Sequence, residues 1–424
     1  MHIDRRIIEW CVMLSAFKKV NIPVMSVFFY LALFSIPGYA IHKNLVVTDV
    51  DENGIVRRSH NKFFGSCVGC TEIIGDLVAT IDANEDWYCT KTDCFFPDKH
   101  PTDFDLIIED PIRWDKNKNL IIHTKGNIIF KNGGKIINEN NGSIILKAGM
   151  EPGENKEYRK TIKFDNNDLN FIYLEIWGTG KVKFYYNPQG SEKRKHKYHN
   201  SESYFYSQYL KFLNRDEDFT AYMLVNNIMD LQHISAFPSG DYALSQDVDA
   251  AETQNWARGQ GFMPVGGTRQ DDMPFTGNFD GNNYTIKNLY INRPDEDNVA
   301  IFALSSGRIL SNNVISNLFI EKAHVVGNFR VGTVVSESFK TNFYNIYIKD
   351  STIIGYGPVG SVAGTLEYGD AKEVEQDEKT QVFIGNKQVN QKRLFGAVLL
   401  SDSYQVCAEN SCKQSSVDKP KKEL

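Results

Sequence analysis

The feature that most restricts the possible folds is a repeat in the second half of the chain. The strings IKNLYI, ISNLFI and FYNIYI place Asn288, Asn317 and Asn345 at intervals of 29 and 28 residues. A second set of strings follows the copies in turn, namely VAIFAL, VGTVVS and VGSVAG. Each copy alternates apolar and polar residues and is rich in Ile, Val, Tyr and Phe, which indicates a strand. Self-similarity at this period is typical of stacked repeats, in which each unit covers the apolar face of the next.

The repeat predicts an all-β fold, a right-handed parallel β-helix (β-solenoid) with one short helix and irregular capping segments. Successive side chains of a strand point to opposite faces, so the residues around each repeated Asn divide into core and surface sets. The predicted core residues are Leu289, Ile291, Leu318, Ile320, Ile346 and Ile348. Two explanations of the repeated Asn remain open. Stacked amide side chains can form a hydrogen-bonded ladder, or Asn is used because it tolerates a corner with positive φ.

A shorter repeat lies upstream. The strings NLII, NIIF, KIIN and SIIL begin at intervals of eight residues. Because eight is even, Leu120, Ile128, Ile136 and Ile144 are predicted to share one face of their strands. Two pairings fit this pattern. Three strands can form the three sides of a 24-residue coil, or the NGG string at residues 132–134 can be the hairpin turn of an antiparallel meander. The later repeats favour the coil.

The first 40 residues predict an export signal. A basic portion precedes an apolar core at residues 24–36. The small residues Gly38 and Ala40 follow, which predicts cleavage after Ala40. An apolar core of this length is short for a bilayer span, which needs roughly 20 residues. The alternative is an uncleaved membrane anchor.

The cysteines agree with an exported chain. One of them, Cys11, lies in the predicted signal. The others form three local pairs, Cys67 with Cys70, Cys89 with Cys94, and Cys407 with Cys412. Short-range disulfides are expected in an oxidising compartment. The alternative is a zinc site, because the first two pairs come close to a four-cysteine zinc spacing.

One helix is predicted between the two repeat regions. Asp218 can serve as its N-cap, and Leu224, Ile228 and Leu231 follow at helical spacing. The expected segments are a signal peptide (1–40), a cysteine-containing N-terminal cap (41–102), a first β-solenoid segment (103–189), a polar and basic linker (190–217), a second β-solenoid domain (218–370) and a C-terminal cap and tail (371–424).

Two stretches carry a resemblance to known families. The strings NLIIHTKGNIIFKNGGKI, GSIILKAG and VKFYYNP, in the first solenoid segment, resemble the β-helical region of filamentous haemagglutinin-type secreted proteins. The string FTGNFDGNNYTIKNLYI and the copies after it, in the second, are similar to the segment that carries GLUG repeats in bacterial surface proteins. The resemblance implies a right-handed β-helix in a secreted or surface-exposed bacterial adhesin. It also implies export through an outer-membrane two-partner transporter, although the sequence lacks the NPNL- and NPNG-type motifs of the usual secretion domain.

The sequence offers no familiar catalytic motif and no histidine-based metal site. It contains no HExxH, GxSxG or P-loop string, and none of its nine histidines has a metal-ligand spacing. The best candidates for chemistry are Asp247, Asp249 and Asp280, because a parallel β-helix can align carboxylates for polysaccharide cleavage and oxygen-rich turns can bind calcium. The alternative is that Asp occupies these turns for local backbone reasons. We therefore expect no catalytic residue, no metal and no cofactor.

The expected function is adhesion. Solenoids expose long faces of stacked side chains that suit extended ligands, so the expected partner is a host-surface or matrix component, either glycan or protein. A net charge of −6 does not favour nucleic acid as a partner. The alternatives are a carbohydrate-active β-helix enzyme, of polysaccharide lyase or hydrolase type, and an inert stalk from a larger adhesin.

Overall fold

The computed structural model describes part of the chain. The described residues are 49–50, 56–57, 78–80, 88–89, 93–96, 105–108, 111–114, 117–131, 133–152, 160–165, 171–188, 208–213, 218–267, 273–308, 311–400 and 403–405. The predicted signal peptide and the candidate disulfide residues Cys67, Cys70, Cys407 and Cys412 lie outside them.

The chain divides into two units, the first being residues 1–79 with 84–86 and the second residues 80–83 with 87–424. In the first, strands β1 (Asp49–Val50) and β2 (Val56–Arg57) pair antiparallel. Strand β3 (Val78–Thr80) contains the boundary. The second unit holds the structure described below.

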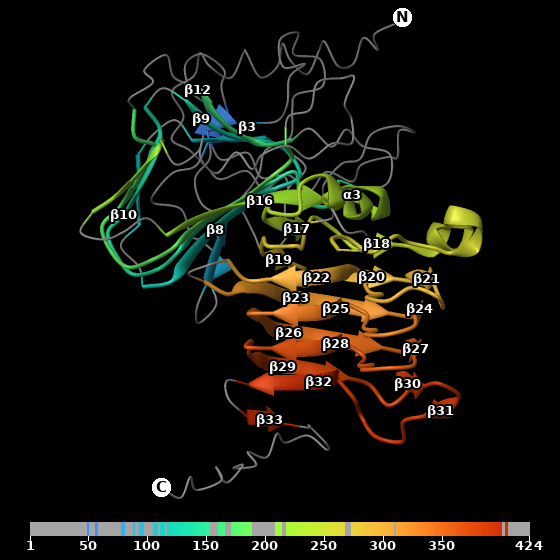
Figure 1. Ribbon diagram of the computed structural model, residues 1–424. Helices are drawn as coiled ribbons and strands as arrows, with labels where there is room; N and C mark the ends of the chain where they lie inside the picture. Colours follow the sequence, from blue (N-terminus) through green and yellow to red (C-terminus); the bar gives the residue numbers. More distant parts are fainter. Residues whose placement is uncertain are drawn as a thin grey trace, which may run out of the picture. The chain divides into compact units, whose positions relative to one another are not determined.

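The second unit is mostly β-structure in parallel sheets (Figure 1). One sheet, the long sheet, continues through the whole unit. Its strands, in order of pairing, are β5 (Asp93–Phe96), β8 (Asn119–Thr124), β11 (Ile144–Ala148), β14 (Val182–Tyr186), β16 (Phe219–Val225), β17 (Tyr242–Leu244), β19 (Phe279–Asp280), β23 (Asn313–Glu321), β26 (Thr341–Lys349) and β29 (Ala371–Gln376). Strand β4 (Tyr88–Cys89) pairs antiparallel with β5, while β18 (Val248–Asp249) pairs with β20 (Thr285–Lys287) and β20 with β23.

Four smaller sheets accompany the long sheet. In the N-terminal half, one contains β6 (Asp105–Ile108), β9 (Ile128–Lys131) and β12 (Ile162–Asp165), and another β7 (Pro111–Trp114), β10 (Lys135–Asn138), β13 (Leu174–Ile176) and β15 (Leu210–Phe212). In the C-terminal half, one contains β21 (Tyr290–Asn292), β24 (His324–Val326), β27 (Thr352–Gly355), β30 (Gln381–Ile384) and β31 (Lys387–Gln388). The last contains β22 (Phe302–Ser306), β25 (Val335–Phe339), β28 (Ala363–Glu367), β32 (Phe395–Leu400) and β33 (Ser403–Gln405).

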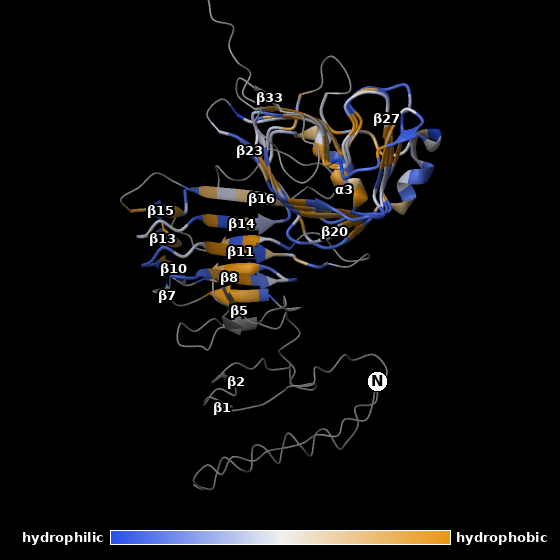
Figure 2. Ribbon diagram, turned by 90° about the horizontal axis from the view of Figure 1, so that it is seen from below, coloured by the Kyte–Doolittle hydropathy of each residue, from blue (hydrophilic) through white to orange (hydrophobic). Residues whose placement is uncertain are grey.

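The eight-residue repeat pairs in parallel rather than as an antiparallel meander. Strands β8 and β11 pair with Leu120 opposite Ile144, and β7 and β10 keep the same interval. Strands β9 and β10 belong to different sheets, so residues 132–134 do not connect a hairpin. Four equivalent apolar residues are all fully buried, namely Leu120, Ile128, Ile136 and Ile144. Figure 2 shows the apolar character of β8 and β11, which lie side by side.

The C-terminal repeat also pairs in parallel, with the same register from strand to strand. Ile315 of β23 lies opposite Phe343 of β26, which lies opposite Ala371 of β29. The two smaller sheets keep this interval, since β24 pairs with β27 and β25 with β28 (Figure 1). The predicted core residues are all buried: Leu289, Ile291, Leu318, Ile320, Ile346 and Ile348.

The first copy of the repeat is displaced relative to the alignment expected from the sequence. That alignment sets Ile286 against Ile315. In the structure Ile286 instead lies opposite Ile320. Asn288 therefore follows the end of β20, while Asn317 lies inside β23. The three repeated Asn residues do not form one column.

An insertion explains the displacement. Asp280 pairs with Ser316 and Thr285 pairs with Phe319, so five steps along the first copy match three steps along the second. The two extra residues are accommodated in the turn at residues 281–284, where two consecutive Asn residues have positive φ. An alignment of the strings by residue identity misses these two residues. The register is set instead by the pair of residues that precedes the turn.

Parallel pairing also continues across three of the segment boundaries expected from the sequence. Strand β5, in the expected cap 41–102, pairs with β8. Strand β15, in the expected linker 190–217, pairs with β13. Strands β29, β30 and β32 extend three sheets beyond residue 370. The string AKEVEQ of β29 is mostly exposed and half of its residues are charged, which is typical of a protected sheet edge and hides the repeat.

The predicted helix begins later than expected. Asp218 precedes strand β16, and Leu224 lies within that strand, where pairing with β14 overrides the helical spacing. Helix α3 (Ile228–His233) is capped by Asn227, whose side chain accepts the Asp230 N–H at 2.9 Å. The 3-10 helices η3 (Ile234–Ala236) and η4 (Ala251–Gly259) follow. Within the described ranges no helix is long and apolar enough to cross a membrane.

The two candidate disulfide residues that the structure describes, Cys89 and Cys94, are close in register. Strands β4 and β5 form an antiparallel pair in which Cys89 lies directly opposite Cys94. Directly opposed positions of antiparallel strands have Cα separations of about 4.5–5.5 Å, within the range that a disulfide bridges. The backbone is therefore compatible with the predicted local pair.

Candidate binding face on the long sheet

Side chains on β23 depart from strict alternation at one residue. Ile315 is buried, Ser316 and Asn317 are both partly exposed, and Leu318 is buried again. Asn317 has a φ of +52°, and Asn345 of β26 has the same value. Asn adopts this left-handed conformation more readily than most residues. One such residue shifts the phase by one position, so that apolar side chains stay inside on both sides of the Asn.

The same Asn residues form a hydrogen-bonded column. Asn345 Nδ2 donates to Asn317 Oδ1 at 3.1 Å, and Asn317 Nδ2 donates to Asp280 Oδ1 at 3.0 Å. We name Asp280, Asn317 and Asn345 the Asn column. For Asn317 and Asn345 the ladder and the positive φ therefore coexist. Asn288 also has positive φ, at +58°, but its side chain donates to Asp249 Oδ1 at 2.9 Å instead.

Aromatic side chains flank the Asn column on both sides. Phe319 and Tyr347 are opposite each other, two positions beyond the Asn of their strands. Tyr344, one position before Asn345, lies opposite Ser316. All three aromatic side chains are partly exposed and alternate with buried neighbours, so they belong to the outer face of the sheet. We name Phe319, Tyr344 and Tyr347 the aromatic flank.

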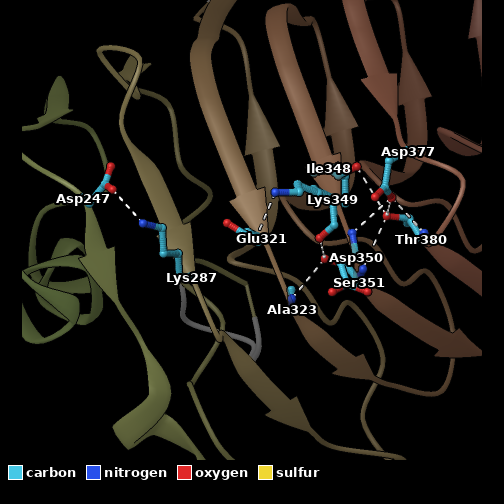
Figure 3. Close-up of polar contacts among 10 residues, drawn as sticks. All are labelled: Asp247, Lys287, Glu321, Ala323, Ile348, Lys349, Asp350, Ser351, Asp377 and Thr380. Atoms are coloured by element: carbon cyan, nitrogen blue, oxygen red, sulfur yellow. Dashed lines mark hydrogen bonds and ion pairs between the residues drawn. The ribbon is translucent and has the colours of Figure 1, made fainter.

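A column of alternating charge follows at the end of these strands. Asp249 lies opposite Lys287, Lys287 opposite Glu321, and Glu321 opposite Lys349. Figure 3 shows two ion pairs in this region, Lys287 Nζ with Asp247 Oδ2 at 2.8 Å and Lys349 Nζ with Glu321 Oε1 at 3.2 Å. The hydrogen bond and charge of Asp247 raise the pKa of Lys287. Opposite charges at facing positions of neighbouring strands stabilise this register.

The corner after β26 is fixed by one carboxylate (Figure 3). Asp377 Oδ1 accepts the Asp350 N–H at 3.0 Å, the Thr380 N–H at 2.9 Å and the Thr380 hydroxyl at 2.6 Å. Burial acts to raise the pKa of Asp377, but the hydrogen bonds from Thr380 and Asp350 outweigh it and hold the pKa below its ordinary value. The ionised Asp377 carboxylate therefore holds the backbone of the corner by accepting its hydrogen bonds.

Each of the three carboxylates considered for catalysis accepts a backbone N–H. Asp247, Asp249 and Asp280 accept the N–H groups of Thr285 at 2.9 Å, Ala251 at 3.0 Å and Asn282 at 2.8 Å, respectively. Among the residues that the structure describes, no group of three His, Cys, Asp or Glu side chains could hold a metal ion. The contacts of Asp249 and Asp280 reach a residue two positions away and match the turn explanation. The contact of Asp247 instead joins residues 38 apart in the sequence.

A buried tyrosine, remote in sequence, binds the first member of the Asn column. The Tyr185 hydroxyl donates to Asp280 Oδ2 at 2.6 Å, although 95 residues separate them. The Tyr185 ring stacks on Tyr222 with centroids 4.9 Å apart, and Lys147 Nζ lies 4.7 Å from its centroid. Burial, and next the charge of Asp280, raise the pKa of Tyr185 well above its ordinary value. The hydroxyl therefore keeps its proton and acts as a donor.

The turn after Asp280 makes two further contacts with the N-terminal half. Lys147 Nζ donates to Asn282 Oδ1, and the Tyr284 hydroxyl donates to Glu151 Oε1 at 3.2 Å. Sequence reasoning missed these residues. The available signal was that β16 carries apolar residues on both faces, with five consecutive buried positions. Such a run indicates a strand that is covered on both sides.

We expect the charge column to act as a unit. Exchanging the signs of one pair, with Glu321→Lys and Lys349→Glu together, preserves that ion pair but sets the new lysine opposite Lys287. The like charges should lower the free energy of unfolding by up to about 1 kcal/mol. Urea unfolding at low salt measures this loss, and a repeat at about 1 M salt should reduce it by screening.

The control for this exchange is an ion pair outside the column. Arg113 and Glu139 are 2.6 Å apart, and the Arg side chain is well exposed. Exchanging Arg113→Glu with Glu139→Arg should change the free energy of unfolding little, because an exposed isolated pair contributes modestly in either direction. Equal, near-zero effects for the two exchanges would refute the cooperative role of the column.

Comparison with known proteins gives a limited result. No family model matches the chain, and no solved structure matches it. The chain is similar to halomucin of Haloquadratum walsbyi, with 34% identity over 148 residues. This match covers 34% of the present chain and 2% of halomucin.

Proposed function

We propose that the parallel sheets form a right-handed β-helix and that the chain is a secreted or surface-exposed adhesin. The constant parallel registers of the two repeat regions support the β-helix, because one helical turn would return the chain to the same sheet. The observation that carries the adhesin proposal is the outer face of the long sheet, where the Asn column and the aromatic flank recur in register on neighbouring strands.

This face has the chemistry of a binding surface. Amide side chains offer both donors and acceptors, while aromatic rings offer large apolar contact area with little conformational entropy to lose. Both are presented on paired strands that keep them in place. A glycan or an extended protein segment from a host surface or matrix suits such a surface. Asp247 and Asp249 each accept a backbone N–H, so both have a structural role that needs no catalytic one.

The location follows from two supporting observations. Residues 1–40 have the pattern of an export signal. The similarity to halomucin supports a secreted or cell-surface protein. The resemblance to filamentous haemagglutinin-type and GLUG-repeat proteins would make the cell bacterial and the export route a two-partner outer-membrane transporter.

The test is a glycan and matrix-protein array probed with the chain coupled to beads, because many copies strengthen a weak individual contact. A polysaccharide depolymerisation assay is run beside it. We expect binding to at least one glycan or matrix protein without turnover. Depolymerisation that disappears with Asp247→Asn or Asp249→Asn would replace the adhesin proposal with a carbohydrate-active enzyme. Silence in both assays would leave an inert stalk as the better explanation.

A further inference from the structure

We propose that the ligand of this face is a neutral, linear polysaccharide that runs across the strands, over the Asn column and between the residues of the aromatic flank. The inference rests on the proposed adhesin function and specifies its substrate class. Three properties of the face lead to it, namely its periodicity, its hydrogen-bonding capacity and its balance of charge.

The periodicity favours a polymer. Asn317 and Asn345 are on neighbouring strands, as are Phe319 and Tyr347. Neighbouring strands are about 4.8 Å apart, which is comparable with the length of one pyranose unit in an extended glycan. A linear polysaccharide running perpendicular to the strands would therefore present one equivalent unit to β23 and one to β26. An irregular protein surface has no such repeat.

The Asn column keeps hydrogen-bonding capacity for a ligand. Asn317 donates one N–H to Asp280 and accepts one N–H from Asn345. A primary amide has two N–H donors and two acceptor lone pairs, so one N–H and one lone pair of Asn317 remain. The ladder fixes the amide orientation before a ligand arrives, which reduces the entropy lost on binding. A donor beside an acceptor suits a sugar hydroxyl, which can both donate and accept.

The aromatic flank suits the apolar C–H face of a sugar ring. Phe319 has no polar group on its ring, so its exposed part can offer only apolar contact. Tyr347 offers the same ring area together with a hydroxyl. The C–H face of a pyranose packs against such rings, while its equatorial hydroxyls point sideways toward the amides of the Asn column.

The charge balance favours a neutral glycan over an acidic one. Two lysines beside the flank have carboxylate partners: Lys287 with Asp247 at 2.8 Å and Lys349 with Glu321 at 3.2 Å. The exposed Lys372 lies 3.9 Å from Glu373. A lysine whose charge is balanced by a neighbouring carboxylate attracts a carboxylate or sulfate group less than an unpaired one does. The chain as a whole carries a net charge of −6, which repels polyanions.

The experiment measures binding of soluble oligosaccharides to the full chain by calorimetry. The panel contains neutral linear hexasaccharides (cello-, chito- and laminari-), acidic chains (hyaluronan, alginate and heparin fragments) and matrix proteins. We expect a neutral oligosaccharide to bind, with an affinity that rises with chain length and is insensitive to salt. Phe319→Ala and Tyr347→Ala should each weaken this binding about tenfold, through loss of one ring contact.

The controls separate this inference from the proposed function. Phe329→Ala and Tyr356→Ala remove aromatic side chains that are 42% and 66% exposed but lie outside the long sheet, and they should leave affinity unchanged. Thermal unfolding checks that every variant is folded. Binding confined to acidic glycans or matrix proteins would overturn the neutral-glycan inference and keep the adhesin. Neutral-glycan binding that survives both flank substitutions would overturn the assigned face. Absence of any binding would overturn the proposed function as well.

Discussion

Replacing Leu318 with Asp is expected to unfold the C-terminal half of the second unit. The Leu318 side chain is fully buried and lies opposite Ile346 of the next strand. An unpaired carboxylate at this position should lower the free energy of unfolding by roughly 4 kcal/mol or more, a large part of the stability of a typical domain. Thermal unfolding followed by circular dichroism measures the effect. Leu318→Met, which keeps the apolar volume, should cost less than about 1.5 kcal/mol.

The matched control is the neighbouring outward position. Phe319→Asp introduces the same carboxylate one residue later, on the partly exposed face, and should cost much less. Asn317→Asp is unsuitable as a neutral control, because its new carboxylate would face the Asp280 carboxylate that now accepts the Asn317 amide at 3.0 Å. A stable Leu318→Asp variant beside an unfolded Phe319→Asp variant would show that the two faces are assigned the wrong way round.

Burial and strand type were predictable because they depend on local pattern. On both sides of Asn317 and Asn345, buried and partly exposed side chains alternate, as expected for a strand with one buried face. The spacing of these two copies in the sequence also matches their register in the sheet. The first copy was aligned wrongly because IKNLYI resembles ISNLFI in letters. Its register is set by the turn at residues 281–284, where two additional residues fit between paired positions.

The extent of the sheets was harder to predict for a different reason. Strand β29 pairs with β26 through its backbone, and its side chains are selected for an edge rather than for a core. Strand β15 lies in a segment whose polar flanks suggested a linker. Pairing through backbone hydrogen bonds leaves little trace in composition, so a short or exposed strand can join a sheet without a recognisable repeat.

Only part of the candidate face could be found from the sequence. The Asn column is visible as a repeated letter, but its first member, Asp280, was considered for catalysis rather than for the ladder. The contact between Tyr185 and Asp280 spans 95 residues and depends on how two distant strands of the long sheet meet the same turn. No local periodicity encodes such a contact.

Replacing Asp280 with Ala is expected to lower the free energy of unfolding by about 3 kcal/mol or more. Its carboxylate is buried and accepts hydrogen bonds from the Tyr185 hydroxyl at 2.6 Å, the Asn317 amide at 3.0 Å and the Asn282 N–H at 2.8 Å. Removing the acceptor leaves the buried Tyr185 hydroxyl without its partner, which alone costs about 1–3 kcal/mol. Urea denaturation at neutral pH gives the change directly.

A double-mutant cycle isolates the contact. Tyr185→Phe removes the donor, and the double variant removes both partners together, so that no buried hydroxyl is left unpaired. The double variant should therefore lose at least about 1 kcal/mol less than the sum of the single losses. Tyr222→Phe, at the ring that stacks on Tyr185, serves as the control and should show a smaller coupling to Asp280. Simple additivity for Tyr185 and Asp280 would refute the contact.

The Tyr185→Phe variant also provides a second readout of the same contact at alkaline pH. Burial and the charge of Asp280 raise the pKa of Tyr185 in the folded state above its unfolded value of about 10. The folded state thus holds this proton more tightly, so the stability is fully present below about pH 10 and falls as the pH rises above it. Without the hydroxyl, the free energy of unfolding should fall less steeply over that range. An unchanged alkaline slope would mean that the Tyr185 hydroxyl titrates as an exposed phenol, and the contact with Asp280 would have to be abandoned.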